Sequence, residues 1–178
     1  MSESGQEETV DSGGNIVNNR SEQTLQEEAM AQKITLRPAS TADEPFLLRL
    51  RKRTMTDHLQ KAGVPADDET HYERIRSNFE DAKVIRADDE DVGLLKVSRA
   101  VAEWHVHQLQ ISPDYQGRGI GKAVLGLVLE EAKDANVAVS LSVMHDNPAR
   151  RLYERLGFKL VGETPRDVLL VWHPQAPS

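Results

Sequence analysis

The segment that most constrains the fold lies at residues 110–121 and reads QISPDYQGRGIG. It contains the end of an apolar strand, a turn and three glycines that lead directly into a helix. Glycines at the start of a helix leave the backbone N–H groups of the first turn accessible to a ligand. Those unpaired amides, together with the positive end of the helix dipole, attract anions such as phosphates. The segment therefore predicts a strand–loop–helix unit that binds a phosphate-bearing molecule, with a plain glycine-rich turn as the alternative.

The spacing of these glycines argues against two common phosphate-binding loops. A P-loop requires a glycine where this chain has Gln116 and a hydroxyl residue where it has Ala123. A dinucleotide-binding loop, G-x-G-x-x-G, would require its third glycine at Lys122 or at Val124. The chain therefore lacks the lysine–hydroxyl chemistry of a phosphotransferase, which remains an alternative only if ATP binds and coenzyme A does not.

A different pattern, Q/R-x-x-G-x-G/A, fits the loop at Gln116, Gly119 and Gly121. This pattern resembles the pyrophosphate loop of the GCN5-related N-acetyltransferase (GNAT) family. A second hallmark of the same family follows another apolar strand, where Asn147 precedes A-x-x-x-Y-x-x-x-G-F, with the tyrosine at Tyr153. The two hallmarks occur in the family's order, and the resemblance covers residues 33–173.

The pattern of apolar residues predicts a β-α-α-β-β-β-α-β-α-β-β order of elements. The expected strands are at residues 33–39, 83–87, 92–99, 104–112, 137–143, 158–163 and 167–172. The expected helices span about 43–62, about 68–79, 123–135 and the segment after Asn147. The order and the resemblance together predict an α/β protein with the GNAT acyl-CoA N-acyltransferase fold, a central mixed sheet flanked by about four helices.

The resemblance implies that acetyl-CoA binds as a cosubstrate along the loop and the preceding strand. In the family, this strand separates from its neighbour, and freed backbone groups pair with the pantetheine arm. The amide of Leu109 is also placed to stabilise an oxyanion. The implied coenzyme-binding residues are Leu109, Gln110, Ile111, Gln116, Gly117, Arg118, Gly119, Ile120, Gly121, Lys122, Asn147 and Tyr153.

Two histidines are the candidate bases. Strict alternation along the strand would place His105, His107, Leu109 and Ile111 on one face. A primary amine is protonated at pH 7 and must lose a proton to attack, and histidine, with a pKa of about 6.5, can accept it. Packing within the sheet is the alternative role. Zinc binding would need a third ligand that the sequence does not supply, so we expect no metal cofactor.

Tyr153 and Asn147 each have a structural alternative to the role that the resemblance implies. By resemblance, the hydroxyl of Tyr153 protonates the departing thiolate, although a tyrosine next to an apolar helix stripe also packs in a core. Asn147 precedes Pro148, which is a favourable arrangement for starting a helix. Capping and contact with the pantetheine arm are compatible for Asn147.

Charge is distributed unevenly along the 178 residues, whose formal net charge is −7. Residues 1–32 contain seven acidic side chains and one arginine, with few large apolar groups, which predicts a disordered acidic tail before a domain at 33–175. The rest is almost neutral, so nucleic acid is not an expected partner. The chain has no cysteine, which excludes disulfides and an acyl-cysteine intermediate. No apolar run is long enough to span a membrane, and we expect a cytoplasmic monomer or homodimer.

The combined interpretation is an acetyl-CoA-dependent N-acetyltransferase in which a primary amine attacks the thioester directly in a ternary complex. His105 or His107 would remove the proton, and Tyr153 would return one to sulfur. The acceptor is a small-molecule amine or a peptide amine, the latter at a protein N-terminus or a lysine. The alternative from another class is a non-catalytic acyl-CoA sensor that uses the same loop.

Overall fold

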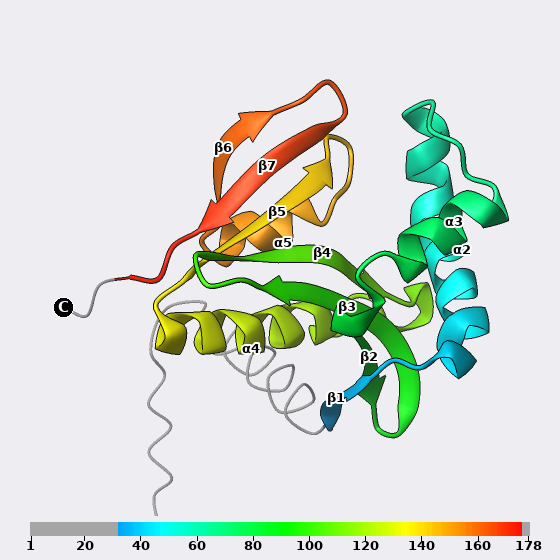
Figure 1. Cartoon of the computed structure of the whole chain (residues 1–178), viewed down its shortest axis with the longest axis horizontal. Coiled ribbons are helices and arrows are strands. Elements are labelled where there is room, and N and C mark those ends of the chain that lie inside the picture. Colours follow the sequence, from blue (N-terminus) through cyan, green and yellow to red (C-terminus); the bar gives the residue numbers. More distant parts are fainter. Residues whose placement is uncertain (1–31, 176–178) are drawn as a thin grey trace, which may run out of the picture. The chain divides into compact units, whose positions relative to one another are not determined.

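Strands and helices follow the predicted order in a computed structural model that describes residues 32–175 (Figure 1). The strands are β1 (Ile34–Pro38), β2 (Ala82–Ala87), β3 (Glu90–Arg99), β4 (Glu103–Ile111), β5 (Ala138–Met144), β6 (Lys159–Glu163) and β7 (Asp167–Trp172). The helices are α2 (Glu44–Lys61), α3 (Asp68–Arg76), α4 (Ile120–Ala135) and α5 (Arg150–Arg155). The predicted mixed α/β fold is confirmed. The predicted acidic tail lies, apart from Gln32, outside the described residues.

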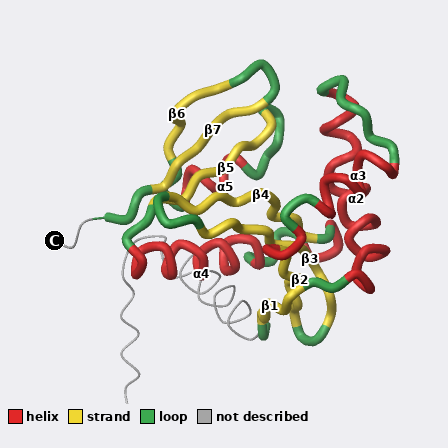
Figure 2. The backbone as a smooth tube through the Cα atoms, in the orientation of Figure 1, coloured by secondary structure: helices red, strands yellow, loops and turns green. Residues whose placement is uncertain are grey.

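The strands form one seven-stranded sheet in the order β1-β2-β3-β4-β5-β7-β6. All neighbouring pairs are antiparallel except β4 and β5, which run parallel. This parallel pair is short, because only residues 103–106 of β4 pair with residues 138–141 of β5. The two strands then diverge (Figure 2), so the last five residues of β4 have no partner on β5. One edge of β4 is therefore available to a ligand where the strand ends.

Helices cover both faces of the sheet, and each face has its own hydrophobic cluster. Adjacent residues of β3 show the division, since Leu95 belongs to the cluster beneath α4 and α5 while Leu94 belongs to the cluster beneath α2 and α3. Successive side chains of a strand point to opposite faces, so one strand contributes to both clusters. The sheet is thus the middle layer that carries the two helix pairs.

Helix α4 is held to the sheet by a wide apolar surface. Ile120, Val124, Leu125 and Val128 are all at most 1% exposed. Burying each such side chain contributes roughly 1.5–3 kcal/mol relative to leaving it in water. The helix ends at Ala135, and its C-cap residue Asn136 closes the last turn with a left-handed φ of 54°. This packing fixes the position of the N-terminus of α4, which lies beside the end of β4.

Helix α3 is anchored to the sheet by a buried lysine. The Nζ atom of Lys96 on β3 donates hydrogen bonds to the carbonyl oxygens of Arg74, Ile75 and Ser77, at 3.0, 2.9 and 2.6 Å. Burial lowers the pKa of Lys96 to about 8, so the ammonium persists at neutral pH. The helix ends at Arg76 rather than at Phe79 as predicted, because its last carbonyl groups bind this ammonium and Asn78 turns the chain with a φ of 52°.

Strand β4 contains a bulge that the sequence does not reveal. On β3, one residue separates Leu95 from Val97, whereas two residues separate their partners Leu109 and Val106 on β4. His107 is the extra residue, and it follows directly after the last residue that pairs with β5. A bulge of this kind changes which face each later side chain occupies.

The bulge makes the predicted common face wrong. Leu109 and Ile111 pack against the cluster beneath α4, as do Trp104 and Val106 from before the bulge. The ring of His107 instead contacts the hydroxyl group of Ser98, which is the cross-strand partner of His105. The two histidines therefore share a face with each other, but Leu109 and Ile111 point to the opposite face.

Candidate active site

The glycine loop has the backbone geometry that the sequence predicts. Gly117 and Gly119 adopt left-handed φ values of 77° and 80°, and no atom lies within 4 Å of the place where a Cβ would be in either residue. No side chain caps the start of α4, where Gly119 is the N-cap residue. The first amides of α4 are therefore open to a ligand, as an anion-binding helix start requires.

Side chains of the loop hold it against β4. Gln116 donates a hydrogen bond from Nε2 to the carbonyl oxygen of Ile111, at 2.9 Å. The guanidinium of Arg118 lies 4.9 Å from the centre of the Tyr115 ring and donates to the carbonyl oxygen of Asp114. The first residue of the hallmark thus supports the loop, which gives Gln116 a structural function in addition to any contact with a ligand.

A cleft of about 400 Å³ lies between α2, the end of β4, the glycine loop and α5. Several predicted residues line it together, from segments far apart in the sequence: Leu109, Gln110, Ile111, Gln116, Gly121, Asn147 and Tyr153. Other predicted residues lie outside its lining, namely Gly117, Arg118, Gly119, Ile120, Lys122, His105 and His107. The cleft joins one glycine of the loop, the free edge of β4 and the predicted acid.

Tyr153 has a buried ring and lines this cleft. The residue is 7% exposed, and its ring packs edge-on against Phe158 at 5.9 Å between centroids. Burial raises the pKa of Tyr153 to about 12, so the phenol keeps its proton throughout the neutral range. The hydroxyl group makes no hydrogen bond with another described residue, although the residue lines the cleft. Packing and proton donation are therefore both compatible with its position.

Asn147 starts the turn that leads into α5. Its Oδ1 accepts a hydrogen bond from the amide of Ala149 at 2.9 Å, and its carbonyl oxygen accepts one from the amide of Arg150. Regular helix begins only at Arg150 with Ala149 as its N-cap, so Asn147 forms a side-chain turn before the helix and is not the predicted N-cap. Gly157 ends this segment with a φ of 100°, a left-handed conformation that favours glycine.

The floor of the cleft offers a polar atom without a partner. Gln110 is 6% exposed, and its Oε1 makes no hydrogen bond within the described part of the chain. Beside it, β3 approaches β4 so closely that a Cβ on Gly93 would lie 2.4 Å from the carbonyl oxygen of Gln110. A buried amide oxygen without a partner favours a ligand or water that donates to it.

The two strand histidines bind hydroxyl groups instead of facing the cleft. Nδ1 of His105 lies 2.8 Å from Oγ of Ser140, and Nε2 of His107 lies 2.9 Å from Oγ of Ser98. Their rings pack edge-on with centroids 4.8 Å apart. Burial lowers the pKa of both histidines, which keeps them neutral at pH 7. Their role as bases stays a prediction.

Helix α2 contributes the cleft residues that the sequence did not single out. Arg53 and Asp57 are one i,i+4 pair, and Thr54 and His58 are the next, so the four residues form adjacent rows facing the cleft. Met55 completes the set. The i,i+4 spacing was the available signal, but charged residues on a helix are typical of a solvated face.

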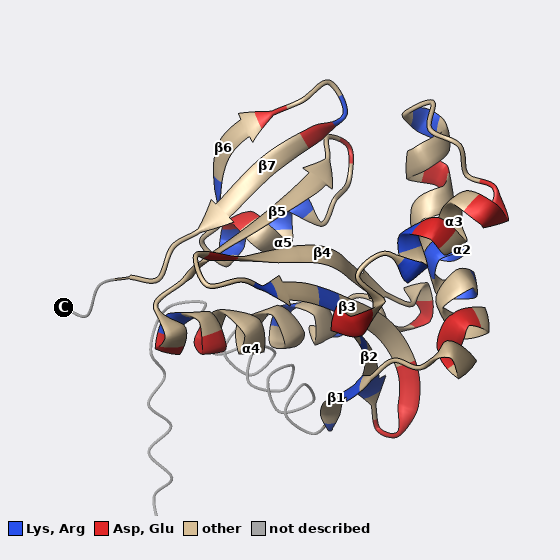
Figure 3. Ribbon diagram, in the orientation of Figure 1, with Lys and Arg blue, Asp and Glu red and all other residues tan. Residues whose placement is uncertain are grey.

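A solvent-exposed ion pair links this helix to the segment before the glycine loop. Arg53 contacts Asp114 at 3.0 Å, and the guanidinium holds the pKa of that carboxyl below its usual value. At the other end of the row, Nδ1 of His58 is 3.7 Å from Oδ1 of Asp146. Acidic and basic residues both occur on α2 and α3 (Figure 3), so charge does not select a substrate class.

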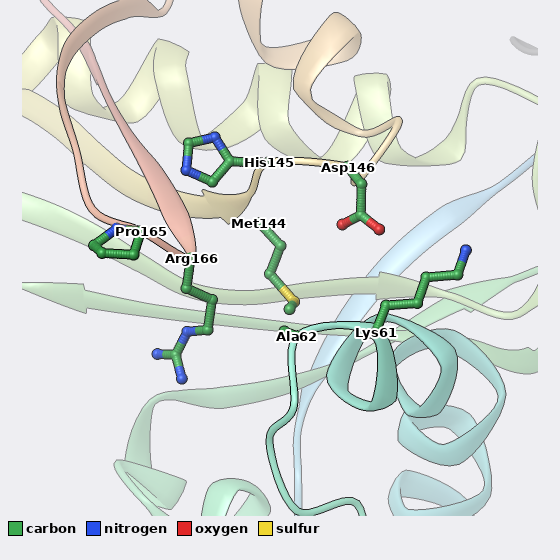
Figure 4. Close-up of a pocket in the computed structure, with 7 residues that line it drawn as sticks. All are labelled: Lys61, Ala62, Met144, His145, Asp146, Pro165 and Arg166. Atoms are coloured by element: carbon green, nitrogen blue, oxygen red, sulfur yellow. The ribbon is translucent and has the colours of Figure 1, made fainter.

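A second hollow of about 280 Å³ lies next to the end of α2. Asp146 lines it together with Lys61 and Ala62 from the helix, and Arg166 lines it from the turn between β6 and β7. The carboxylate of Asp146 points toward the end of α2, whereas the ring of His145 points away from it (Figure 4).

Two further observations concern residues 32–175 as a whole. They contain no group of three or more histidine, cysteine, aspartate or glutamate side chains that could hold a metal ion. Nor does any helix in that range have the length and apolar character needed to cross a bilayer.

Comparisons with known proteins agree with this fold. Residues 54–174 match the family described as Acetyltransferase (GNAT) domain. The solved PaiA N-acetyltransferase from Thermoplasma acidophilum, in complex with coenzyme A, matches with a TM-score of 0.63 at 19% identity, over 79% of this chain and 99% of that one. At this identity, the likeness shows the fold alone. The family match covers more than half of the chain, so the protein belongs to the GNAT acetyltransferase family.

Two relatives are similar to part of this chain. The N-alpha-acetyltransferase RimI of Mycobacterium tuberculosis is 43% identical over 61 residues, which are 34% of this chain and 37% of the relative. The ribosomal protein bS18-alanine N-acetyltransferase of Haemophilus influenzae is 35% identical over 71 residues, which are 39% of this chain and 49% of the relative. The chain thus spans less than half the length of each of these relatives.

Proposed function

We propose that this protein transfers an acetyl group from acetyl-CoA to a primary amine by direct attack in a ternary complex. The observation that carries the proposal is the cleft in which the glycine loop, the free edge of β4 and Tyr153 meet. Membership of the acetyltransferase family supports it.

The donor side fits the pyrophosphate and the pantetheine arm of acetyl-CoA. The pyrophosphate would bind the amides at residues 117–122, where two left-handed glycines leave open space. The pantetheine arm would then follow the edge of β4 at Leu109 and Ile111, which has no partner on β5. The coenzyme supplies the activated thioester, and the chain supplies its orientation.

Tyr153 is the proposed acid that protonates the leaving sulfur. Its hydroxyl has no partner among the described residues, and its raised pKa of about 12 keeps it protonated at working pH. General acid–base assistance of this kind is typically worth about 10²–10⁴ in rate.

The acceptor would enter from the side of α2. One relative is named an N-alpha-acetyltransferase and the other a ribosomal protein bS18-alanine N-acetyltransferase, and these names favour a peptide α-amine as the acceptor. Gln110, whose Oε1 lacks a partner, would accept a hydrogen bond from the bound amine or its first peptide group.

A thiol-release assay over a panel of acceptors tests the proposal. The panel contains small primary amines, a lysine side-chain amine and short peptides that begin with alanine. Wild-type protein should release free thiol with at least one acceptor. Tyr153→Phe should bind acetyl-CoA with unchanged affinity in calorimetry but turn over about 10²–10⁴-fold more slowly.

The same assay separates the enzyme from a non-catalytic acyl-CoA sensor. A sensor would bind acetyl-CoA and release no thiol with any acceptor. If acetyl-CoA produces neither binding heat nor thermal protection, both the donor site and the transferase assignment are incorrect.

A further inference from the structure

His58 is a titratable residue of the cleft to which neither family hallmark gives a role. It lies in the last turn of α2 and lines the cleft together with Tyr153. Its side chain is 22% exposed, and its Nδ1 is buried without a hydrogen-bond partner among residues 32–175. The nearest carboxylate oxygen is Oδ1 of Asp146, at 3.7 Å.

Nδ1 of His58 faces the carboxylate of Asp146. The N–H or lone-pair directions of the two ring nitrogens diverge widely. A ring with Nδ1 toward Asp146 therefore directs Nε2 away from that carboxylate. A carboxylate beside one ring nitrogen stabilises the imidazolium that forms when the other nitrogen accepts a proton. Asp146 is half exposed and comes directly before Asn147, which also lines the cleft.

The strand histidines lack this arrangement. His105 and His107 each contact a serine hydroxyl group, and neither lines the cleft. The bulge at His107 further separates their face from that of Leu109 and Ile111. Among the described histidines, His58 alone lines this cleft with Tyr153.

Given the proposed acetyl transfer, we propose that His58 accepts the proton that the ammonium substrate must lose, with Asp146 as the residue that positions its ring. The ammonium gives one proton to Nε2 of His58, and the free amine forms a C–N bond with the thioester carbon. The C–S bond then breaks, and the sulfur takes the proton of Tyr153. The tyrosinate takes the second proton of the nitrogen, and His58 releases its proton to water.

Charged groups of both signs surround His58. Those that line the cleft or the adjoining hollow are Arg53, Asp57 and Lys61 on α2, Asp146 after β5, and Arg166 between β6 and β7. Arg53 is already paired with Asp114. Asp146 is the one within ion-pair distance of the ring, so its removal is the informative change.

The test compares pH profiles of kcat/KM for wild type and His58→Gln, with the best acceptor of the panel. We expect His58→Gln to lower kcat about 10²–10⁴-fold near pH 7, with the loss shrinking at high pH where the amine deprotonates unaided. The affinity for acetyl-CoA in calorimetry should stay within about twofold, because His58 lies outside the loop. His58→Ala should regain part of its rate in added imidazole.

Two further variants make the result specific. His145→Gln keeps a donor toward the carbonyl oxygen of Thr164 and should leave kcat/KM within about threefold, because its ring points away from Asp146. Asp146→Asn should lower kcat in the wild-type background and have little further effect in the His58→Gln background, because the proposed role of Asp146 acts through that ring. A structural role for Asp146 would lower kcat by the same factor in both backgrounds.

Several outcomes overturn the inference while leaving the transferase assignment intact. One is wild-type turnover that His58→Gln retains at pH 7. Another is loss of the neutral-pH rate in the His105→Ala/His107→Ala double variant while His58→Gln keeps it, which would return the role of base to the strand. Absence of turnover in wild-type protein with every acceptor would instead refute the transferase assignment.

Discussion

Two glycines of the loop allow a matched test of its geometry, because Gly119→Ala and Gly121→Ala add the same methyl group two residues apart. Gly119 has a φ of 80°, and nothing lies within 4 Å of its missing Cβ. The alanine there would meet no neighbour, so its cost is the left-handed backbone alone, roughly 1–2 kcal/mol. Gly119→Ala should therefore lower the free energy of unfolding by about that amount.

Gly121 should respond in the opposite direction. It lies in the first turn of α4, and a Cβ there would be 3.5 Å from Cδ2 of Leu152 and 3.8 Å from Cγ1 of Ile111, which are ordinary contacts. Replacing glycine by alanine in a compatible helix position stabilises by roughly 0.4–1 kcal/mol. The two variants should differ by roughly 1.4–3 kcal/mol in the free energy of unfolding, with wild type between them.

Thermal denaturation and calorimetric titration with acetyl-CoA check both parts of the reasoning. At about 2–4 °C per kcal/mol, the two melting temperatures should separate by several degrees. Gly119→Ala should also weaken the binding of acetyl-CoA, since its methyl group enters the space proposed for the pyrophosphate. Gly121→Ala should bind acetyl-CoA with the affinity of the wild type. If Gly119→Ala melts like wild type, the left-handed geometry is wrong. If it melts early yet binds acetyl-CoA at full affinity, the loop does not approach the coenzyme.

Two predictions concern stability away from the loop. Arg37 donates to both carboxylate oxygens of Asp43, and this hydrogen bonding lowers the pKa of Asp43 to about 2. A carboxyl group with a lowered pKa in the folded state stabilises the fold at pH values above its unfolded pKa, and this stabilisation is lost as the pH falls. Asp43→Asn should therefore lower the free energy of unfolding by roughly 1–2 kcal/mol at pH 7 and by progressively less between pH 4 and 2, as measured by urea denaturation. Lys96→Met would leave the carbonyls of Arg74, Ile75 and Ser77 without their donor, so it should lower the free energy of unfolding by at least about 2 kcal/mol. The control variant Lys83→Met on β2 should lower it by less than about 0.5 kcal/mol. Equal melting temperatures of the two lysine variants would contradict the anchoring role of Lys96.

The order of elements and the loop were predictable because they depend on local signals. Gly117 and Gly119 indicate a left-handed turn between a strand and a helix, and the apolar residues that begin at Ile120 indicate a helix that packs on a sheet. Asn147 indicates that a helix starts nearby, although the N-cap of α5 is Ala149, and Gly157 lies just after its end. Each of these features is decided by the chemistry of a few neighbouring residues, which a single sequence contains.

The features that were missed depend on contacts between distant segments. The histidines at 105 and 107 alternate as in a regular strand, and only the pairing with β3 reveals the extra residue. The premature end of α3 depends on an ammonium group from β3 that binds its last carbonyl groups. His58 looks like a solvated helix residue until the packing of α2 brings it to the cleft. No short stretch of the sequence encodes these contacts between distant segments.

The bulge in β4 has a consequence for how this strand can vary. The bulge occurs where pairing with β5 stops. It therefore divides the strand into a part that pairs with both β3 and β5 and a part that pairs with β3 alone. Each half keeps its own inward and outward order. Substitutions beyond the bulge leave the inward and outward order of residues 103–106 unchanged, so the part of β4 that pairs with β5 can persist while the free edge diverges.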